Sequence, residues 1–265
     1  MKTTWLSLAG LITIFLVTDI TSAQSVTPTV VSPGQVAVSG PARHGTDAEH
    51  GNKKEPRKLH PIPHHGGGPD RDDVLQADEG LLLNTDVGIN FPGVGSNGFA
   101  PPDTNIAVGP NHILQAVNSR YAIFDKNGIL LAGPFALSSL WTNFGEGNAC
   151  TTSNSGDVIA QYDKLADRFI VTQLGSFTAP YSECIAVSQT SDPTGSYWLY
   201  SYSFGIQLND YPKFGVWPTA TNSAYLATYN LFANAQTFTG AALCAYDRSK
   251  MLVTYPLSGA LRWTR

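Results

Sequence analysis

Residues 157–202, DVIAQYDKLADRFIVTQLGSFTAPYSECIAVSQTSDPTGSYWLYSY, decide the fold that we expect. They contain four apolar or alternating runs, DVIAQY, RFIVTQL, CIAVSQ and YWLYSY. Short links rich in Asp, Gly, Ser and Pro separate these runs, and this pattern is typical of strands joined by turns. The stretch therefore predicts one sheet of four antiparallel strands.

The same texture continues through residues 81–265, which we predict to be one all-β domain. A short helical turn is expected at Ser138–Phe144, and no long amphipathic helix is expected. Ten strands are predicted: Thr104–Val108, Ile113–Val117, Tyr121–Phe124, Asp157–Tyr162, Phe169–Leu174, Cys184–Val187, Tyr197–Tyr202, Phe214–Trp217, Ala224–Tyr229 and Ala241–Tyr246.

An aspartate stands at three strand entries, in PPDT at Asp103, in SGDV at Asp157 and in NDYP at Asp210. The spacings of 54 and 53 residues indicate a repeated four-stranded sheet. Such sheets around one axis form a β-propeller, whose first strands line a central channel. We therefore predict a β-propeller-like fold in which the three carboxylates converge.

About three blades fit this length, and propellers usually close with four to eight. We expect a truncated propeller that lacks C-terminal blades. Assembly with another chain and a different all-β fold are the alternatives.

A second recurring device is a strand that ends in an aspartate-bearing turn. It occurs in YAIFDKNG, in AQYDKLADRF and in CAYDRSKM. The carboxylate in such a turn can accept hydrogen bonds from the backbone of the turn itself.

The N-terminal residues differ from this domain. Lys2, the apolar run Trp5–Val17 and the small residues before Gln24 predict a signal peptide over residues 1–23. Residues 24–80 are rich in Pro, Gly, His and charge, which predicts a disordered linker. A secreted or periplasmic protein without a membrane span after cleavage is expected, and an uncleaved N-terminal anchor is the alternative.

The composition of the chain limits the kinds of partner that it can bind. A formal net charge of −4 and a pI near 5.8 argue against a nucleic-acid-binding surface. Export permits disulfides, and we predict a Cys150–Cys184 bond, with Cys244 as a buried free thiol. No paired CxxC spacing indicates a zinc site.

The chain resembles a group of secreted, mostly bacterial, propeller-like proteins. The resemblance covers roughly residues 90–252 and lies in PPDTNIAVGPNH, AIFDKNG, SGDVIAQYDKLADRFIVTQ, CIAVSQTSDPTGSYW, DYPKFGVWP and CAYDRSKM. It implies a secreted β-propeller and no particular chemistry, and members of the group usually continue beyond this length.

Two shorter likenesses point to sugar-processing propellers. TSDPTGSYW at 190–198 resembles the Asp-box of sialidase-type propellers, in which that motif is structural. PPDT and SGDV loosely resemble the aspartates that open the blades of five-bladed glycosidases.

Asp103, Asp157 and Asp210 are the candidate catalytic residues of a glycoside hydrolase or lyase. Converging carboxylates push each other's pKa values apart, so that one acts as an acid while another stays ionised. Capping of turns and binding of calcium are the alternative roles of these residues. No other cofactor is expected, and Glu183 is expected to be an exposed loop residue.

His112, Tyr211 and Trp217 are the candidate ligand-binding residues, because exposed aromatic rings and a histidine can contact sugars. The leading hypothesis is a carbohydrate- or surface-binding module whose partners are glycans or a cell-surface polymer. A purely structural extracellular domain is the remaining alternative.

Overall fold

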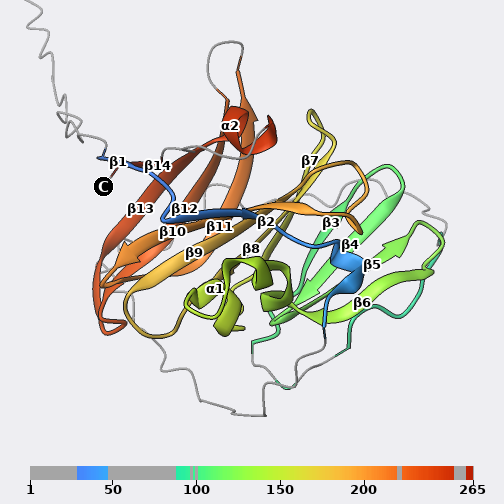
Figure 1. Ribbon diagram of the computed structural model, residues 1–265, viewed down its shortest axis with the longest axis horizontal. Coiled ribbons are helices and arrows are strands. Elements are labelled where there is room, and N and C mark those ends of the chain that lie inside the picture. Colours follow the sequence, from blue (N-terminus) through green and yellow to red (C-terminus); the bar gives the residue numbers. More distant parts are fainter. Residues whose placement is uncertain are drawn as a thin grey trace, which may run out of the picture.

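The computed structural model describes residues 29–46, 88–95, 98, 101–219, 223–253 and 261–264. The described residues form three antiparallel sheets and a few short helices, which confirms the all-β class (Figure 1). The predicted signal peptide, 1–23, lies outside the described residues.

Sheet 1 is a four-stranded meander. Its strands are β3 (Asn105–Val108), β4 (His112–Val117), β5 (Arg120–Asp125) and β6 (Leu130–Ala136), and they pair in chain order.

Sheet 2 repeats this plan and adds a fifth strand. β7 (Ile159–Asp163), β8 (Arg168–Leu174), β9 (Tyr181–Ser188) and β10 (Tyr197–Gly205) pair in chain order. β2 (Gln35–Val38) then pairs with the outer side of β10.

Sheet 3 has the same arrangement. β11 (Gln207–Pro218), β12 (Ser223–Ala233), β13 (Thr237–Asp247) and β14 (Leu261–Thr264) pair in chain order. β1 (Thr29–Val31) adds the fifth strand beside β14.

Four short helical segments complete the described structure: η1 (Ala42–His44), η2 (Leu137–Phe144), α1 (Ala149–Thr152) and α2 (Arg248–Val253). The second of these confirms the helical turn expected at Ser138–Phe144. Its buried side chains, Trp141 among them, pack into the core between sheets 1 and 2.

All ten predicted strands are present, with ends that differ by at most four residues, except that β11 begins seven residues before the predicted Phe214. The prediction missed β6, whose sequence LLAGPFA is interrupted by Gly133 and Pro134. Proline lacks the backbone N–H that a central strand needs, and β6 tolerates it because it is an edge strand of its sheet.

Part of the predicted disordered linker is wrong. The structure has two strands and a short helix in this segment: β1, β2 and η1. The other described residues of the segment, up to residue 46, link these elements or follow the last of them. Backbone hydrogen bonds on either side of β2 hold it to sheet 2, from Gly34 N to Ser201 O at 2.7 Å and from Ser39 N to Tyr197 O at 2.9 Å. An existing sheet edge supplies the partners that this polar segment cannot supply itself. Residues 24–28 and 47–80 lie outside the described residues.

The aspartate-bearing turns are confirmed at Asp125 and Asp163, whereas Asp247 directly precedes a helix, α2. Asp125 accepts hydrogen bonds from the backbone N–H groups of Asn127 and Ile129, both at 2.8 Å. Asp163 accepts hydrogen bonds from the backbone N–H groups of Leu165 and Ala166. Asp247 accepts one from the backbone N–H of Lys250 at 3.1 Å.

The opening strands of the three sheets are neighbours, with β7 between β3 and β11. The side chain of Asn105 in β3 accepts a hydrogen bond from the backbone N–H of Ala160 in β7 at 3.3 Å. One apolar core fills the space between sheets 1 and 2 and contains Leu114 and Phe169. A second core lies between sheets 2 and 3 and contains Tyr202.

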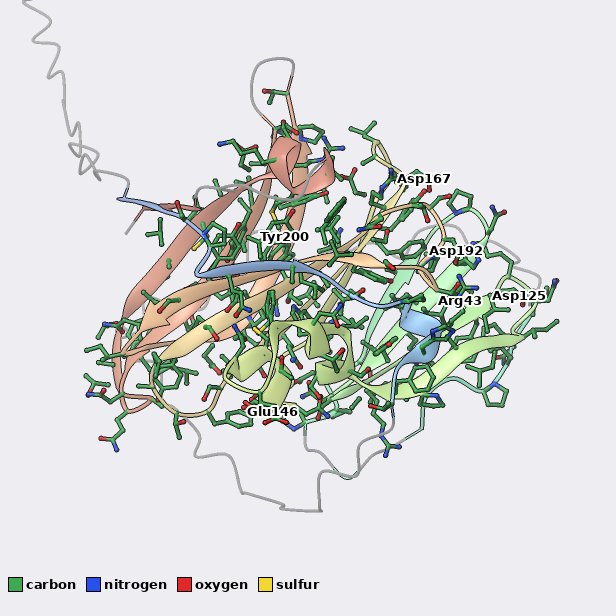
Figure 2. All side chains as sticks on the ribbon, viewed as in Figure 1. Arg43, Asp125, Glu146, Asp167, Asp192 and Tyr200 are labelled. Atoms are coloured by element: carbon green, nitrogen blue, oxygen red, sulfur yellow. A yellow bond between two sulfur atoms is a disulfide. The ribbon has the colours of Figure 1, made fainter. Side chains whose placement is uncertain are left out.

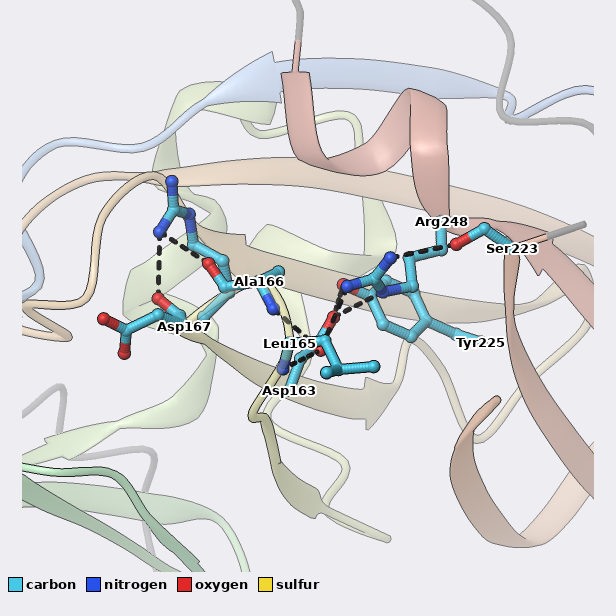
Figure 3. Close-up of polar contacts among 8 residues, drawn as sticks. Asp163, Leu165, Ala166, Asp167, Ser223, Tyr225 and Arg248 are labelled. Atoms are coloured by element: carbon cyan, nitrogen blue, oxygen red, sulfur yellow. Dashed lines mark hydrogen bonds and ion pairs between the residues drawn. The ribbon is translucent and has the colours of Figure 1, made fainter. Parts of the chain in front are cut away.

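A buried ion pair also joins sheets 2 and 3 (Figure 3). Arg248 at the start of α2 donates to both carboxylate oxygens of Asp163, from Nε at 2.6 Å and from Nη2 at 3.1 Å. The hydroxyl of Tyr225 adds a third bond at 3.0 Å. Burial alone would raise the pKa of the Asp163 carboxyl, but the bonds from Arg248, the turn backbone and Tyr225 outweigh it and lower that pKa.

The predicted disulfide is confirmed. Cys150 in α1 and Cys184 in β9 are bonded, and Cys244 is a buried free cysteine. Among the described residues, no helix has the length and apolar character that a membrane crossing requires.

Candidate functional site

A left-handed backbone recurs at the entries of the three opening strands. It is found at Asp103, Asp157 and Tyr211, with φ of 41°, 50° and 54°, and these positions are 54 residues apart each time. Aspartate visits this conformation more readily than most residues because its short polar side chain bonds locally. Regular pairing resumes two residues later in each case, for the third sheet at Lys213. The third equivalent position is therefore Tyr211, and the predicted equivalence of Asp210 is one residue out of register.

The three entry segments meet. Asn118 donates from Nδ2 to Asp103 Oδ2 at 2.5 Å. A Cβ added at Gly156 would lie 2.5 Å from Asn118 Oδ1, so these two residues are in close contact. Asp157 Oδ2 accepts the backbone N–H of Tyr211 at 3.3 Å.

Exposure separates the three candidate aspartates. Asp157 is buried, whereas Asp103 is half-buried and Asp210 is half-buried within β11. The hydrogen bond that Asp157 accepts from Tyr211 joins sheet 2 to sheet 3, so this carboxylate ties two sheets together. Their catalytic, capping and calcium-binding roles stay predictions.

Glu183 differs from its prediction, because it is a fully buried residue of β9 and no exposed loop residue. Asn209 in β11 donates from Nδ2 to Glu183 Oε2 at 2.7 Å. Burial raises the pKa of the Glu183 carboxyl well above its usual value, the charge of Asp157 adds to the rise, and the polar groups of Thr172 and Asn209 oppose it.

The sequence held a signal for this burial. Tyr181, Glu183, Ile185 and Val187 alternate, and alternate residues of a strand share one face. That face packs into the core between sheets 2 and 3.

Two predicted ligand-binding residues are exposed on β11. Tyr211 and Trp217 have exposed fractions of 62% and 70%. Lys213 Nζ lies 3.4 Å from the centroid of the Tyr211 ring, and the space above Gly215 is open. The residues that alternate along one face of β11 are Tyr211, Lys213, Gly215 and Trp217. We call these four residues the β11 ribbon. The strand rise separates its two aromatic residues by roughly 20 Å.

His112 belongs to a different contact. Its Nε2 lies 3.8 Å from Asp192 Oδ1, in the turn between β9 and β10. Asp192 holds that turn by accepting the backbone N–H of Thr194 at 2.9 Å and its hydroxyl at 2.8 Å. Burial raises the pKa of the Asp192 carboxyl, but the Thr194 bonds and the charges of His112 and Arg43 lower it overall. Asp192 and Arg43 lie at the same end of the molecule (Figure 2).

A neutral hollow of about 350 Å³ adjoins α1. Its lining is rich in hydroxyl groups and carries no charged side chain. The lining residues are Gly147, Asn148, Ala149, Thr152, Ser176, Thr178, Ala179, Pro180, Tyr181, Ser182, Ser201 and Ser203.

Comparisons with known proteins add no family to this geometry. No protein-family model, no curated protein and no solved structure matches the chain. The choice of function therefore depends on exposure, contacts and charge in the described residues.

Proposed function

We propose that the protein is an extracellular or periplasmic module that binds carbohydrate through the β11 ribbon. The observation that carries the proposal is the pair of aromatic side chains, Tyr211 and Trp217, each more than three-fifths exposed on one face of one strand. Large exposed aromatic rings are costly to leave in water and commonly mark binding surfaces.

The chemistry of the ribbon suits a sugar chain. The apolar faces of sugar rings stack on indole and phenol rings, while the Lys213 ammonium donates to hydroxyl groups. Gly215 carries no side chain, so a ligand can lie flat along the strand between Lys213 and Trp217. A separation of roughly 20 Å between the rings favours an extended oligosaccharide over a single sugar.

We also propose that the three sheets are successive blades of a propeller. Each is a meander, their opening strands are neighbours, and the left-handed entry recurs every 54 residues. The Cys150–Cys184 disulfide supports an oxidising compartment, where such bonds persist.

The test is binding to a panel of immobilised polysaccharides, followed by titration calorimetry with the best oligosaccharide. We expect Trp217→Ala and Tyr211→Ala each to weaken binding at least about tenfold, which corresponds to about 1.4 kcal/mol. Phe177→Ala is the matched control, because Phe177 is an exposed aromatic residue outside β11, with an exposed fraction of 48%.

Two results would contradict the proposal. One is a bound glycan whose affinity is unchanged in Trp217→Ala. The other is the absence of glycan binding together with self-association that Trp217→Ala abolishes, which would make the ribbon a protein contact.

A further inference from the structure

The neutral hollow beside α1 has a floor that sheet 2 supplies. Ser182 in β9 pairs with Ser203 in β10, and the next pair on the same face is Cys184 with Ser201. All three serines line the hollow. Such neighbouring positions on one face of a sheet lie roughly 5–8 Å apart, so one small ligand can reach all three hydroxyl groups.

Two of these hydroxyl groups have no partner. Ser182 and Ser201 each have an exposed fraction of only 8%, and neither hydroxyl makes a hydrogen bond within the described residues. In the neighbouring loop, by contrast, Ser176 Oγ lies 3.2 Å from Thr178 Oγ1. Buried polar groups nearly always have a partner, so the two unbonded hydroxyl groups favour a polar occupant of the hollow.

The wall that α1 forms is fixed to this floor (Figure 1). The disulfide joins Cys150 in α1 to Cys184 in β9. Asn148 accepts the backbone N–H of Cys150 at 2.8 Å and donates from Nδ2 to Gln35 Oε1 at 2.6 Å. Gln35 in β2 in turn pairs with Ser201 of the floor. The hollow is therefore formed before a ligand enters, which lowers the entropic cost of binding.

We propose that this hollow binds one neutral mono- or disaccharide, separately from the β11 ribbon. Its volume of about 350 Å³ is at the small end of the range of roughly 300–1,000 Å³ that is typical of ligand pockets, which favours a small ligand. A serine hydroxyl both donates and accepts hydrogen bonds, as a sugar hydroxyl does, so the two can pair in either direction.

Other classes of ligand fit this lining less well. A charged ligand would lose its hydration and find no opposite charge, because the lining carries none. A purely apolar ligand would leave the hydroxyl groups of Ser182 and Ser201 without a partner. A nucleobase would find no ring on which to stack, because the aromatic lining residue, Tyr181, packs into the core between sheets 2 and 3.

The hollow and the β11 ribbon lie on different sides of the molecule. The floor belongs to the face of sheet 2 that carries Cys184 and Leu199 into the core between sheets 1 and 2. Phe214 and Val216 alternate with the ribbon residues and pack against the core between sheets 2 and 3, so the ribbon faces away from sheet 2. One small sugar cannot occupy both sites.

The experiment screens the full chain against free sugars by saturation-transfer NMR and then titrates those that bind. The panel is glucose, galactose, mannose, N-acetylglucosamine, maltose and cellobiose, with glucuronate as the charged comparison. We expect at least one neutral sugar to bind, and glucuronate to bind more weakly than glucose.

Two variants locate that binding in the hollow. Ser201→Ala removes an unbonded hydroxyl and should raise the Kd at least about fivefold. Ser203→Leu projects an apolar side chain from an exposed position of the lining and should abolish binding. Ser119→Ala is the matched control and should leave the Kd unchanged, because Ser119 is a buried serine outside the hollow whose hydroxyl also lacks a hydrogen bond within the described residues.

Three results would overturn the proposal. The first is a wild-type chain that binds no sugar of the panel, and the second is a Kd that Ser203→Leu leaves unchanged. The third is binding that Trp217→Ala abolishes and Ser203→Leu keeps, which would place the sugar on the ribbon. If Ser201→Ala does not fold, Ser203→Leu decides, because its side chain replaces an exposed one. The ribbon itself is judged separately, by polysaccharide binding of Trp217→Ala.

Discussion

Replacing Asp163 with asparagine should destabilise the protein strongly at neutral pH. The change removes the negative charge that the Arg248 guanidinium faces, and Arg248 is 9% exposed. Removing one partner of a buried ion pair costs about 3–5 kcal/mol, because the other charge stays buried without compensation. For a chain of this size, Tm should fall by roughly 6–20 °C.

The loss should depend on pH in a defined direction. The Asp163 pKa is lowered in the folded protein, so the stability that it contributes is complete above the unfolded pKa, which is about 3.9. That stability is lost as pH falls through the folded pKa. The difference between wild type and Asp163→Asn should therefore be constant near pH 7 and shrink below about pH 4.

Urea unfolding of both proteins between pH 3 and 8 measures this difference. Asp247→Asn is the matched control, because it breaks only the surface pair of Asp247 with Lys250, at 3.2 Å, and should cost less than about 1 kcal/mol. The reasoning about the buried pair would be refuted by a loss at pH 7 no larger than that of the control, or by a difference that grows as pH falls.

Three other changes probe single contacts by the same urea measurement. Cys150→Ser with Cys184→Ser opens a 34-residue loop and should cost about 3–4 kcal/mol, and a reducing agent should lower wild-type stability to the same level. Gly156→Ala should cost about 1–3 kcal/mol through its φ of 80°, and more through contact with Asn118; an unchanged stability would show that the loop relaxes. Asp192→Ala removes two bonds that hold its turn and should cost about 1 kcal/mol, and a neutral result would mean that the turn does not need them.

Local pattern was sufficient for most of the fold. Strands such as Phe169–Leu174 carry continuous apolar runs, and Asp125 and Asp163 mark the turns that follow their strands. β1 and β2 could not be found in this way, because three or four residues hold too little pattern. These two strands form because they pair with residues more than 150 positions away in the sequence, as Gln35 pairs with Ser201.

The candidate site was predictable only in part. The recurring aspartates located the entries of the opening strands, but the one-residue offset to Tyr211 depends on the irregular pairing of β11 with β12 between Asp210 and Lys213. Glu183 was missed because a charged residue was assumed to face water. Its alternation with Tyr181 and Ile185 places it on the apolar face of β9, and sheet 3, which lies later in the sequence, covers that face.

The pairing of β1 with β14 places a constraint on the timing of folding. Val30 lies opposite Arg262, so a strand near the beginning of the chain has no partner until a segment made more than 230 residues later is available. Non-local pairings of this kind slow folding, because the long loop between them must close first. β1 can therefore cover the outer edge of sheet 3 only after β14 has been made, whereas β2 can pair with β10 about 60 residues of synthesis earlier.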